Sequence, residues 1–353
     1  MKIGIVTFFY ANNYGGVLQA FALQKFLKNS SIDSEFVNYI PNAKNSILAS
    51  FKKLLKKLLK KNKLEDFNQL FKEFRENNLI ISEKFTANSD LKNNKYDIII
   101  SGSDQIWNSR LNKHNTSYFT LDFINNDTKK ISYASCIGQP DQINDYIYSY
   151  DSINSFDYVS VRNDFSKEFL ENNLATKNIF VACDPTMLID FHDLKYELPC
   201  KKYILIYSLN MSLEELLNKV ITTVKELYNL PIIVLNSKYN AVVYDDHISV
   251  SDAKPEQWIY LFKHASYVIT DSFHGVIFSL KYKKNFIALH GNDWRSYRLL
   301  DIAKRYGFID KCIHDLDNKL VLNAEIDYIS TEEKMSKHIS QSNLFLLNAL
   351  KTK

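Results

Sequence analysis

Short runs of β-branched and aromatic residues alternate with helix-like segments along nearly the whole chain. This alternation indicates parallel sheets, because parallel neighbours are joined by crossover helices and not by tight turns. Six candidate strands in the first half span 2–8, 35–40, 97–101, 131–135, 158–161 and 179–182. Five more in the second half span 203–208, 232–235, 247–250, 267–270 and 286–290. The sequence therefore predicts an α/β protein.

Its 353 residues are more than one hydrophobic core usually organises. We predict two consecutive doubly wound, Rossmann-like domains, at 1–195 and 196–330, followed by a C-terminal helix within 331–353 that would cap either domain. Ligands of open parallel sheets gather beyond the carboxyl ends of the strands. Two such domains would face each other across a cleft, so chemistry is to be sought just after strands.

Charge and cysteine usage exclude several classes of protein. The 44 basic residues are nearly matched by 40 acidic ones, for a net charge of +4, which argues against a nucleic-acid partner. The four cysteines lie too far apart in sequence for a short-spaced zinc site or redox pair. The first residues lack the pattern of a signal peptide, and no apolar run approaches about 18 residues. A cytoplasmic protein without a metal is predicted.

A lysine-rich segment at 51–63 has leucines at helical spacing. Such a basic amphipathic helix would lie on an anionic membrane surface. A solvated helix that packs one leucine stripe on the protein has the same pattern, and is the reading we prefer. Peripheral contact with the inner face of the cell membrane remains the alternative.

Paired glycines follow the first predicted strand and precede a helical pattern. Glycines permit a tight turn and close approach of a ligand, while the following helix presents free N–H groups and a positive dipole end. Anions or sugar hydroxyls would suit this loop, and a plain strand-to-helix turn is the alternative. The candidate binding residues here are Asn13, Tyr14, Gly15, Gly16 and Gln19.

The third predicted strand ends in small and polar residues around one tryptophan. Asp104, Gln105 and Asn108 would bond sugar hydroxyls, while Trp107 would stack on a sugar face. Ser103 is a further candidate binding residue of this loop. A helix cap formed by Ser103 or Asp104 competes with this interpretation.

The strand at 267–270 breaks into a polar turn ahead of an apolar helix, and this is the sharpest local signal. His274 stands at the start of that helix, where an imidazole would accept or relay a proton. Asp271 or Ser272 would cap the helix. A structural histidine bonded to a neighbouring carbonyl is the alternative.

Three arginines follow predicted strands in a chain whose basic residues are mostly lysine. Arg162 comes directly after the strand at 158–161, and Arg295 and Arg298 open a helix after the strand at 286–290. The planar guanidinium suits a carboxylate or phosphate. Surface salt bridges and a solvated helix face are the competing interpretations.

Together these segments resemble the polysaccharide pyruvyl transferase family. The resemblance rests on five stretches in order over residues 1 to about 310, namely 12–20, 101–108, 159–162, 183–186 and 270–275. It implies a GT-B-like glycosyltransferase architecture without a metal or other cofactor. It also implies phosphoenolpyruvate as the donor, held largely on the second domain, and a lipid-linked or polymeric glycan as acceptor on the first.

The resemblance gives the residues expected roles. His274 would be the acid or base, Arg162 with Arg295 or Arg298 would clamp the donor anion, and the two first-domain loops would bind the acceptor. Family members carry an arginine two positions before the histidine, where this chain has Ser272. Two alternatives stay open: a GT-B-like glycosyltransferase that uses a nucleotide sugar in surface polysaccharide biosynthesis, and a non-catalytic glycan-binding protein.

Overall fold

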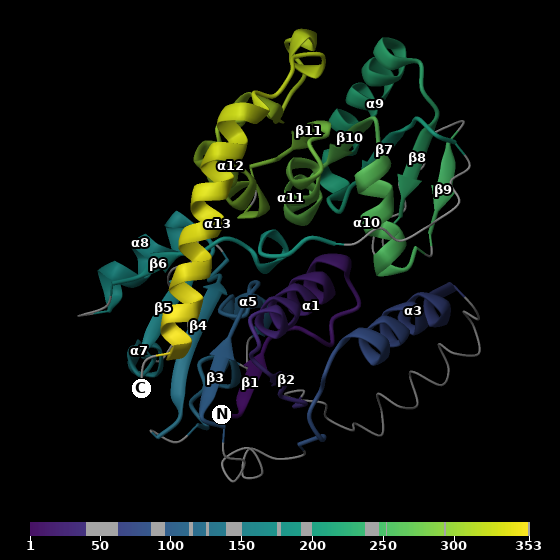
Figure 1. Ribbon diagram of the computed structural model, residues 1–353. Helices are drawn as coiled ribbons and strands as arrows, with labels where there is room; N and C mark the ends of the chain where they lie inside the picture. The colour runs from purple at the N-terminus through teal and green to yellow at the C-terminus, as the bar shows by residue number, and fades with distance from the viewer. Residues whose placement is uncertain are drawn as a thin grey trace.

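The computed structural model of the chain contains two parallel six-stranded sheets (Figure 1). It describes residues 1–39, 63–85, 96–112, 116–124, 127–138, 150–174, 178–191, 200–236, 247–251, 253–292 and 294–351. Most of the lysine-rich segment 51–63 lies outside these residues, so the expectation for it stays a prediction. Among the helices in the described ranges, none is long and apolar enough to cross a membrane.

The first sheet has the strand order β2-β1-β3-β4-β5-β6, with parallel pairing throughout. Its strands are β1 (Ile3–Val6), β2 (Ser34–Phe36), β3 (Ile98–Ser101), β4 (Lys129–Ser135), β5 (Tyr158–Val161) and β6 (Phe180–Val181). β1 and β3 are fully buried, as expected of parallel strands covered by helices on both faces. All six strands were predicted within a few residues.

The second sheet has the order β12-β11-β10-β7-β8-β9, again parallel. Its strands are β7 (Ile204–Tyr207), β8 (Ile232–Leu235), β9 (Ile248–Val250), β10 (Tyr267–Thr270), β11 (Asn285–Leu289) and β12 (Cys312–Ile313). The edge strand β12 was not predicted, because two residues are too few to produce a periodic signal. The order is that of a dinucleotide-binding Rossmann sheet, so the predicted pair of Rossmann-like domains is confirmed.

Helices connect the strands and cover the sheets. In the first domain they are α1 (Tyr14–Asn29), α3 (Lys63–Asn78), α5 (Ser109–Asn112), α6 (Thr116–Phe119), α7 (Tyr150–Asn154), α8 (Asp164–Asn173) and η3 (Pro185–Met187). In the second they are η4 (Met211–Leu213), α9 (Glu214–Tyr228), α10 (Pro255–His264), α11 (Phe273–Lys281), α12 (Trp294–Tyr306), η5 (Ile309–Lys311) and η6 (Lys319–Leu322). The last helix is α13 (Tyr328–Lys351).

Helix α13 packs along α12 and then runs back beside the first domain (Figure 1). Its Ser342 hydroxyl accepts a hydrogen bond from the amide of Cys183 at 3.0 Å. Phe345 stacks on Phe180 of β6, with ring centroids 5.0 Å apart. The helix therefore contacts both domains and holds the segment that follows β6.

The beginning of α1 is buried against the second domain. Tyr14 stacks on Trp258 of α10 with centroids 5.6 Å apart, and its hydroxyl donates to the carbonyl of Ala253 at 2.8 Å. A surface ion pair between Lys254 and Glu73 of α3 adds to this contact. The loop after β1 is thus held at the boundary between the domains.

Candidate active site

The strand orders bring particular loops to the domain boundary. In the first sheet the chain leaves β1 toward β2 on one side, while β3 lies on the other. In the second sheet the same divergence occurs between β7 and β10. Ligands of open α/β sheets bind at such switch points. Asp104 follows β3 and His274 follows β10, so both stand where a ligand site is expected.

A buried ion network lies beyond the carboxyl edge of the first sheet. Arg162, just after β5, donates from Nη1 to Asp184 Oδ2 at 2.8 Å and from Nη2 to Asp104 Oδ1 at 3.0 Å. The Arg162 side chain is only 2% exposed. Both terminal nitrogens of the guanidinium therefore face carboxylates of the protein, and the predicted role of Arg162 as a donor clamp does not fit this arrangement.

His274 connects this network to the second domain. Its Nε2 lies 3.4 Å from Oδ2 of Asp184, the oxygen that also receives Arg162. On the other side the ring faces Gly15, where an added Cβ atom would lie 2.1 Å from Nδ1. A glycine is required at position 15 because the first turn of α1 packs directly on the imidazole. The histidine is thus enclosed by groups from the first domain.

Opposite charges determine the ionisation of the two carboxylates. Burial alone would raise the pKa of Asp184, but His274, Arg162 and Thr186 together hold it well below the usual carboxyl value. Burial likewise opposes ionisation of Asp104, and Arg162, His274 and Arg298 outweigh it, so that its pKa is lowered too. Both carboxylates are therefore ionised at neutral pH and act as acceptors.

Two arginines from different domains approach one aromatic ring. The guanidinium carbon of Arg162 lies 4.4 Å from the ring centroid of Phe273, and that of Arg298 lies 5.8 Å from it. Phe273 is the residue before His274, so Arg298 brings a half-buried positive charge close to the start of α11. Arg295 belongs to α12, but its side chain lies outside the described part of the structure.

Two predicted site residues cap helices that lead away from the boundary. Asn13 accepts from the amide of Gly16 at 2.6 Å and caps α1, while Ser272 accepts from Gly275 at 3.3 Å and caps α11. Asp271 does not cap α11 and instead accepts bonds after β7, one of them from the Ser208 hydroxyl at 2.7 Å. The side chain of Asn13 thus holds the helix start that was predicted to meet an anion, and Ser272 caps the helix that has His274 in its first turn, as predicted.

Two aromatic residues predicted to contact a sugar are part of the core. Trp107 is fully buried, and its indole N–H donates to the carbonyl of Phe119 at 3.1 Å. Tyr14 is 1% exposed at the domain interface. Neither ring offers a free face, so the predicted stacking of Trp107 on a sugar is wrong for this structure.

The remaining polar residues of these loops bond to one another. Gln19 donates to Thr7 Oγ1 at 3.0 Å and accepts from the amide of Ser103 at 3.2 Å. Gln105 accepts from the Asn108 amide at 2.9 Å. Their hydrogen-bonding capacity is used largely within the fold, and its effect is to hold Asp104 in place. The positive φ of 74° at Asp104 shows how tightly that loop is constrained.

Asp184 was not among the predicted site residues, although it touches both Arg162 and His274. Two signals in the sequence pointed to it: Asp184 lies three residues after the end of β6, and it belongs to the segment 183–186, which carries the family resemblance. Because aspartate before proline is common in turns, the sequence pattern was equally consistent with an ordinary turn.

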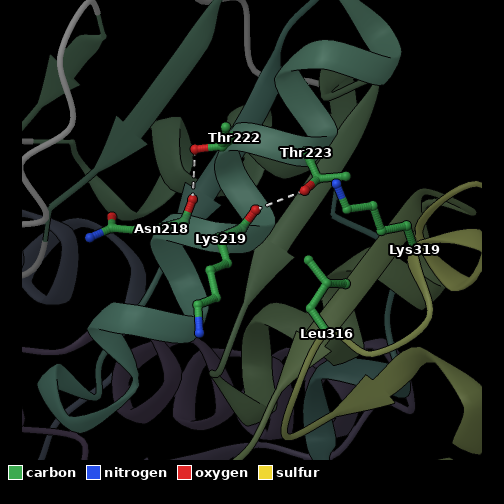
Figure 2. Close-up of a pocket in the computed structure, with 6 residues that line it drawn as sticks. All are labelled: Asn218, Lys219, Thr222, Thr223, Leu316 and Lys319. Carbon is green, nitrogen blue, oxygen red and sulfur yellow. Dashed lines mark hydrogen bonds between the residues drawn. The ribbon is translucent and has the colours of Figure 1, made fainter.

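Elsewhere on the second domain, α9 and the segment before η6 form an open hollow (Figure 2). Thr222 and Thr223 on its wall bond back to carbonyls of their own helix, at 3.0 Å each. The hollow is lined by none of the residues of the charged network, so we place the candidate active site at the domain boundary.

Two Rossmann-like sheets that meet at a boundary, with charged groups at both switch points, have the GT-B architecture of glycosyltransferases and sugar-nucleotide epimerases. The family model of polysaccharide pyruvyl transferases matches residues 13–293. The chain is therefore a member of the polysaccharide pyruvyl transferase family, as its motifs predict. The matched range includes Gly15, Asp104, Arg162, Asp184 and His274. The search of curated proteins found no match to the chain.

Solved structures confirm the architecture. A putative UDP-N-acetylglucosamine 2-epimerase from Listeria monocytogenes aligns with a TM-score of 0.59 at 10% identity, covering 99% of this chain and 95% of its own. The Neisseria meningitidis UDP-GlcNAc 2-epimerase gives 0.57 at 10% identity, and TarM gives 0.56 at 11%, each covering 99% of both chains. At these identities the likeness establishes the fold.

Proposed function

We propose that this protein transfers a pyruvyl group from phosphoenolpyruvate to a sugar of a cell-surface glycan precursor, forming a ketal. The observation that carries the proposal is the family match over 13–293, which spans the network around His274. No resident metal or organic cofactor is needed for this chemistry, because the donor itself supplies the activated carbon.

The donor is proposed to bind at the start of α11. There the helix presents its positive dipole end, and Arg298 contributes a cation near Phe273. We expected Arg162 and a second arginine to bind the donor anion together. Because Arg162 is hydrogen-bonded to Asp104 and Asp184, this role is proposed for Arg298. A carboxylate and a phosphate on one small molecule suit this concentration of positive charge.

The reaction balances with two sugar hydroxyls. The methylene carbon of phosphoenolpyruvate gains a proton and becomes a methyl group, while the first hydroxyl oxygen bonds to the neighbouring carbon. The bond from that carbon to the phosphate oxygen then breaks, the second hydroxyl closes the ketal, and phosphate leaves. Of the two protons released by the sugar hydroxyls, one restores the acid that protonated the methylene carbon, and the other leaves with phosphate. We assign these proton transfers to His274.

The acceptor is proposed to be a lipid-linked or polymeric glycan that approaches from the first domain, in the cytoplasm. In the alternative reading of the basic segment 51–63, it would hold the enzyme reversibly at the inner membrane face, since each lysine near an anionic surface contributes on the order of 1 kcal/mol. Vesicles containing anionic lipid should co-sediment the protein at low salt and release it at high salt. Absence of binding at low salt would leave 51–63 as a solvated helix.

A donor screen tests the proposal directly. Phosphoenolpyruvate and a panel of sugar nucleotides are each incubated with the enzyme and candidate acceptors, followed by mass spectrometry of the product and a phosphate assay. We expect one added pyruvyl ketal and free phosphate. Addition of a hexose with release of a nucleotide would instead establish the glycosyltransferase, an alternative favoured by Ser272 in place of the expected arginine. Acceptor binding without turnover of any donor would indicate a glycan-binding protein.

A further inference from the structure

Asp184 is held in one orientation from several directions. Its Oδ1 accepts from the amide and the hydroxyl of Thr186, at 3.0 and 2.7 Å. Its Oδ2 accepts from Arg162 at 2.8 Å and faces Nε2 of His274 at 3.4 Å. The side chain has no measurable exposure. No rotation is available to the carboxylate without breaking these bonds, so the oxygen directed at His274 is fixed.

The backbone on either side of Asp184 is anchored as well. The amide of Cys183 donates to Ser342 of α13 at 3.0 Å, and its carbonyl accepts from the Tyr133 hydroxyl at 3.2 Å. On the other side Pro185 begins the short helix η3, which packs on α1. Asp184 is therefore a rigid reference point to which the first domain and the C-terminal helix both contribute.

This geometry restricts the ring of His274. An ionised carboxylate has only lone pairs to present, so it favours hydrogen on the ring nitrogen nearest to it. That nitrogen is Nε2, which lies 3.4 Å from Oδ2 of Asp184, is buried and has no hydrogen-bond partner among the described residues. The opposite edge of the ring, with Nδ1, faces Gly15 at the domain boundary. One ring nitrogen is thus assigned to the buried carboxylate and the other to the boundary where a substrate must enter.

We propose that Asp184 is the positioning residue of His274: it keeps hydrogen on Nε2, so that Nδ1 is the atom that exchanges protons with the substrate. Arg162 serves this arrangement by holding Asp184 charged and oriented, and not by binding the donor. The inference rests on the proposed catalytic role of His274. It further means that the proton-transfer group is complete only when the first domain is docked on α11.

The wild-type protein gives the first test, without a donor. In a two-bond proton–nitrogen correlation spectrum of protein labelled with ¹⁵N-histidine, the signals of His274 are identified by their loss in His274→Ala. We expect a neutral ring with hydrogen on Nε2, or a ring protonated at both nitrogens. A neutral ring with hydrogen on Nδ1, or an even mixture of the two tautomers, would overturn the proposal.

The second test is Asp184→Asn, which keeps the size of the side chain and removes its charge. We expect kcat to fall by at least roughly 10-fold, while KM for the donor changes by less than about two-fold, because the tautomer is disturbed and the binding groups remain. In the spectrum, His274 should lose its preference for hydrogen on Nε2. Asp184→Glu should recover part of kcat. A folded Asp184→Asn with unchanged kcat would refute the proposal.

Asp315→Asn is the matched control. Asp315 lies 3.0 Å from Nε2 of His314, but that pair is at the surface and far from the network in sequence. Its loss should leave kcat unchanged. If Asp184→Asn does not fold, Thr186→Val replaces it, since this removes one bond to Oδ1 and should lower kcat to a smaller extent. Because kcat is measured with whichever donor the wild type uses, failure of the pyruvyl assignment is distinguishable from failure of this inference.

Discussion

The loops after β3 and β10 occupy equivalent places, each at the switch point of a parallel sheet, yet they use their polar residues differently. After β3, Ser103 and Gln105 bond within the first domain, and Trp107 is part of its core. After β10, Ser272 caps α11 and leaves the following His274 at the boundary, facing the other domain.

The position of a residue just after a strand therefore predicts that it lies near the ligand site, but it does not predict whether its side chain binds a ligand or stabilises the loop. Polar side chains in the first loop satisfy the hydrogen bonds that a buried, constrained backbone requires. In the second loop the Ser272 side chain caps α11, and His274 is not needed for this, so the side chain of His274 is available for chemistry. The first domain supplies shape and charge orientation, and the second supplies the reacting group. Five substitutions would break or sharpen this comparison.

The largest effect is expected for His274→Ala. Removal of a proton-transfer group typically lowers turnover by about 10²- to 10⁴-fold. Thermal unfolding should change little, because α11 keeps its cap at Ser272. Steady-state kinetics with the correct donor measure the loss, and His314→Ala, at an exposed histidine, is the control. Near-normal turnover in His274→Ala would return this residue to a structural role.

Arg162→Ala should chiefly destabilise the protein. It leaves Asp104 and Asp184 buried near each other without their shared cation, and loss of one partner of a buried ion pair costs about 3–5 kcal/mol. Arg162→Lys should recover only part, because an ammonium cannot reproduce the planar fork. Urea denaturation measures the free energy of unfolding, with Lys219→Ala at an exposed pair as the control.

The pH dependence of that stability has a definite sign. Because the pKa values of Asp104 and Asp184 are lowered in the folded state, their contribution is present above the unfolded carboxyl pKa of about 3.9 and lost as pH falls below it. The difference between wild type and Arg162→Ala should therefore be full at neutral pH and shrink in acid. A difference that grows in acid would contradict the ion network.

Arg298→Ala should weaken donor binding while leaving the fold intact. A charge-assisted hydrogen bond is worth about 1.5–3 kcal/mol, which corresponds to roughly a 10- to 100-fold higher KM or Kd for the donor. Titration calorimetry with phosphoenolpyruvate measures it directly. Lys304→Ala, an exposed cation on the same helix, should have no such effect. Equal affinities in the two variants would remove Arg298 from the donor site.

Gly15→Ala tests whether activity requires the close packing of the first turn of α1 on the imidazole of His274. The new methyl group would lie 2.1 Å from Nδ1, so either the ring or the domain interface must move. Turnover should fall by about 10-fold, the lower part of what a displaced catalytic group costs. At Gly291 an added Cβ would meet only Leu213, at an ordinary 3.4 Å, so Gly291→Ala should retain activity. Equal activity of the two variants would disprove the close fit.

Trp107→Phe should give the smallest effect, and on stability alone. It removes the indole bond to Phe119 and some buried surface, for a loss of about 1–2 kcal/mol. KM for the acceptor should not change, because the ring does not face solvent. An increased acceptor KM at nearly unchanged stability would restore the predicted sugar-stacking role.

The sequence by itself determined the two parallel sheets, because hydrophobic runs and helical spacing are local signals that burial in an α/β fold reinforces. It also located His274 at a helix start, since Thr270 to Gly275 carries both the strand end and the cap. Ordered short motifs were enough to identify the family. These features depend on neighbours in the chain.

Only the tertiary structure decided which polar residues are available for chemistry. Arg162 and Asp184 are 22 residues apart, and Asp184 and His274 belong to different domains, so their contacts depend on strand order and domain docking. Arg162 was predicted to bind a ligand, but its pairing with two carboxylates gives it a structural role. Trp107 was predicted to stack on a sugar, but its burial makes it a core residue. Pairing and burial are properties of the assembled interior, and no local pattern of residues specifies which groups will be satisfied there.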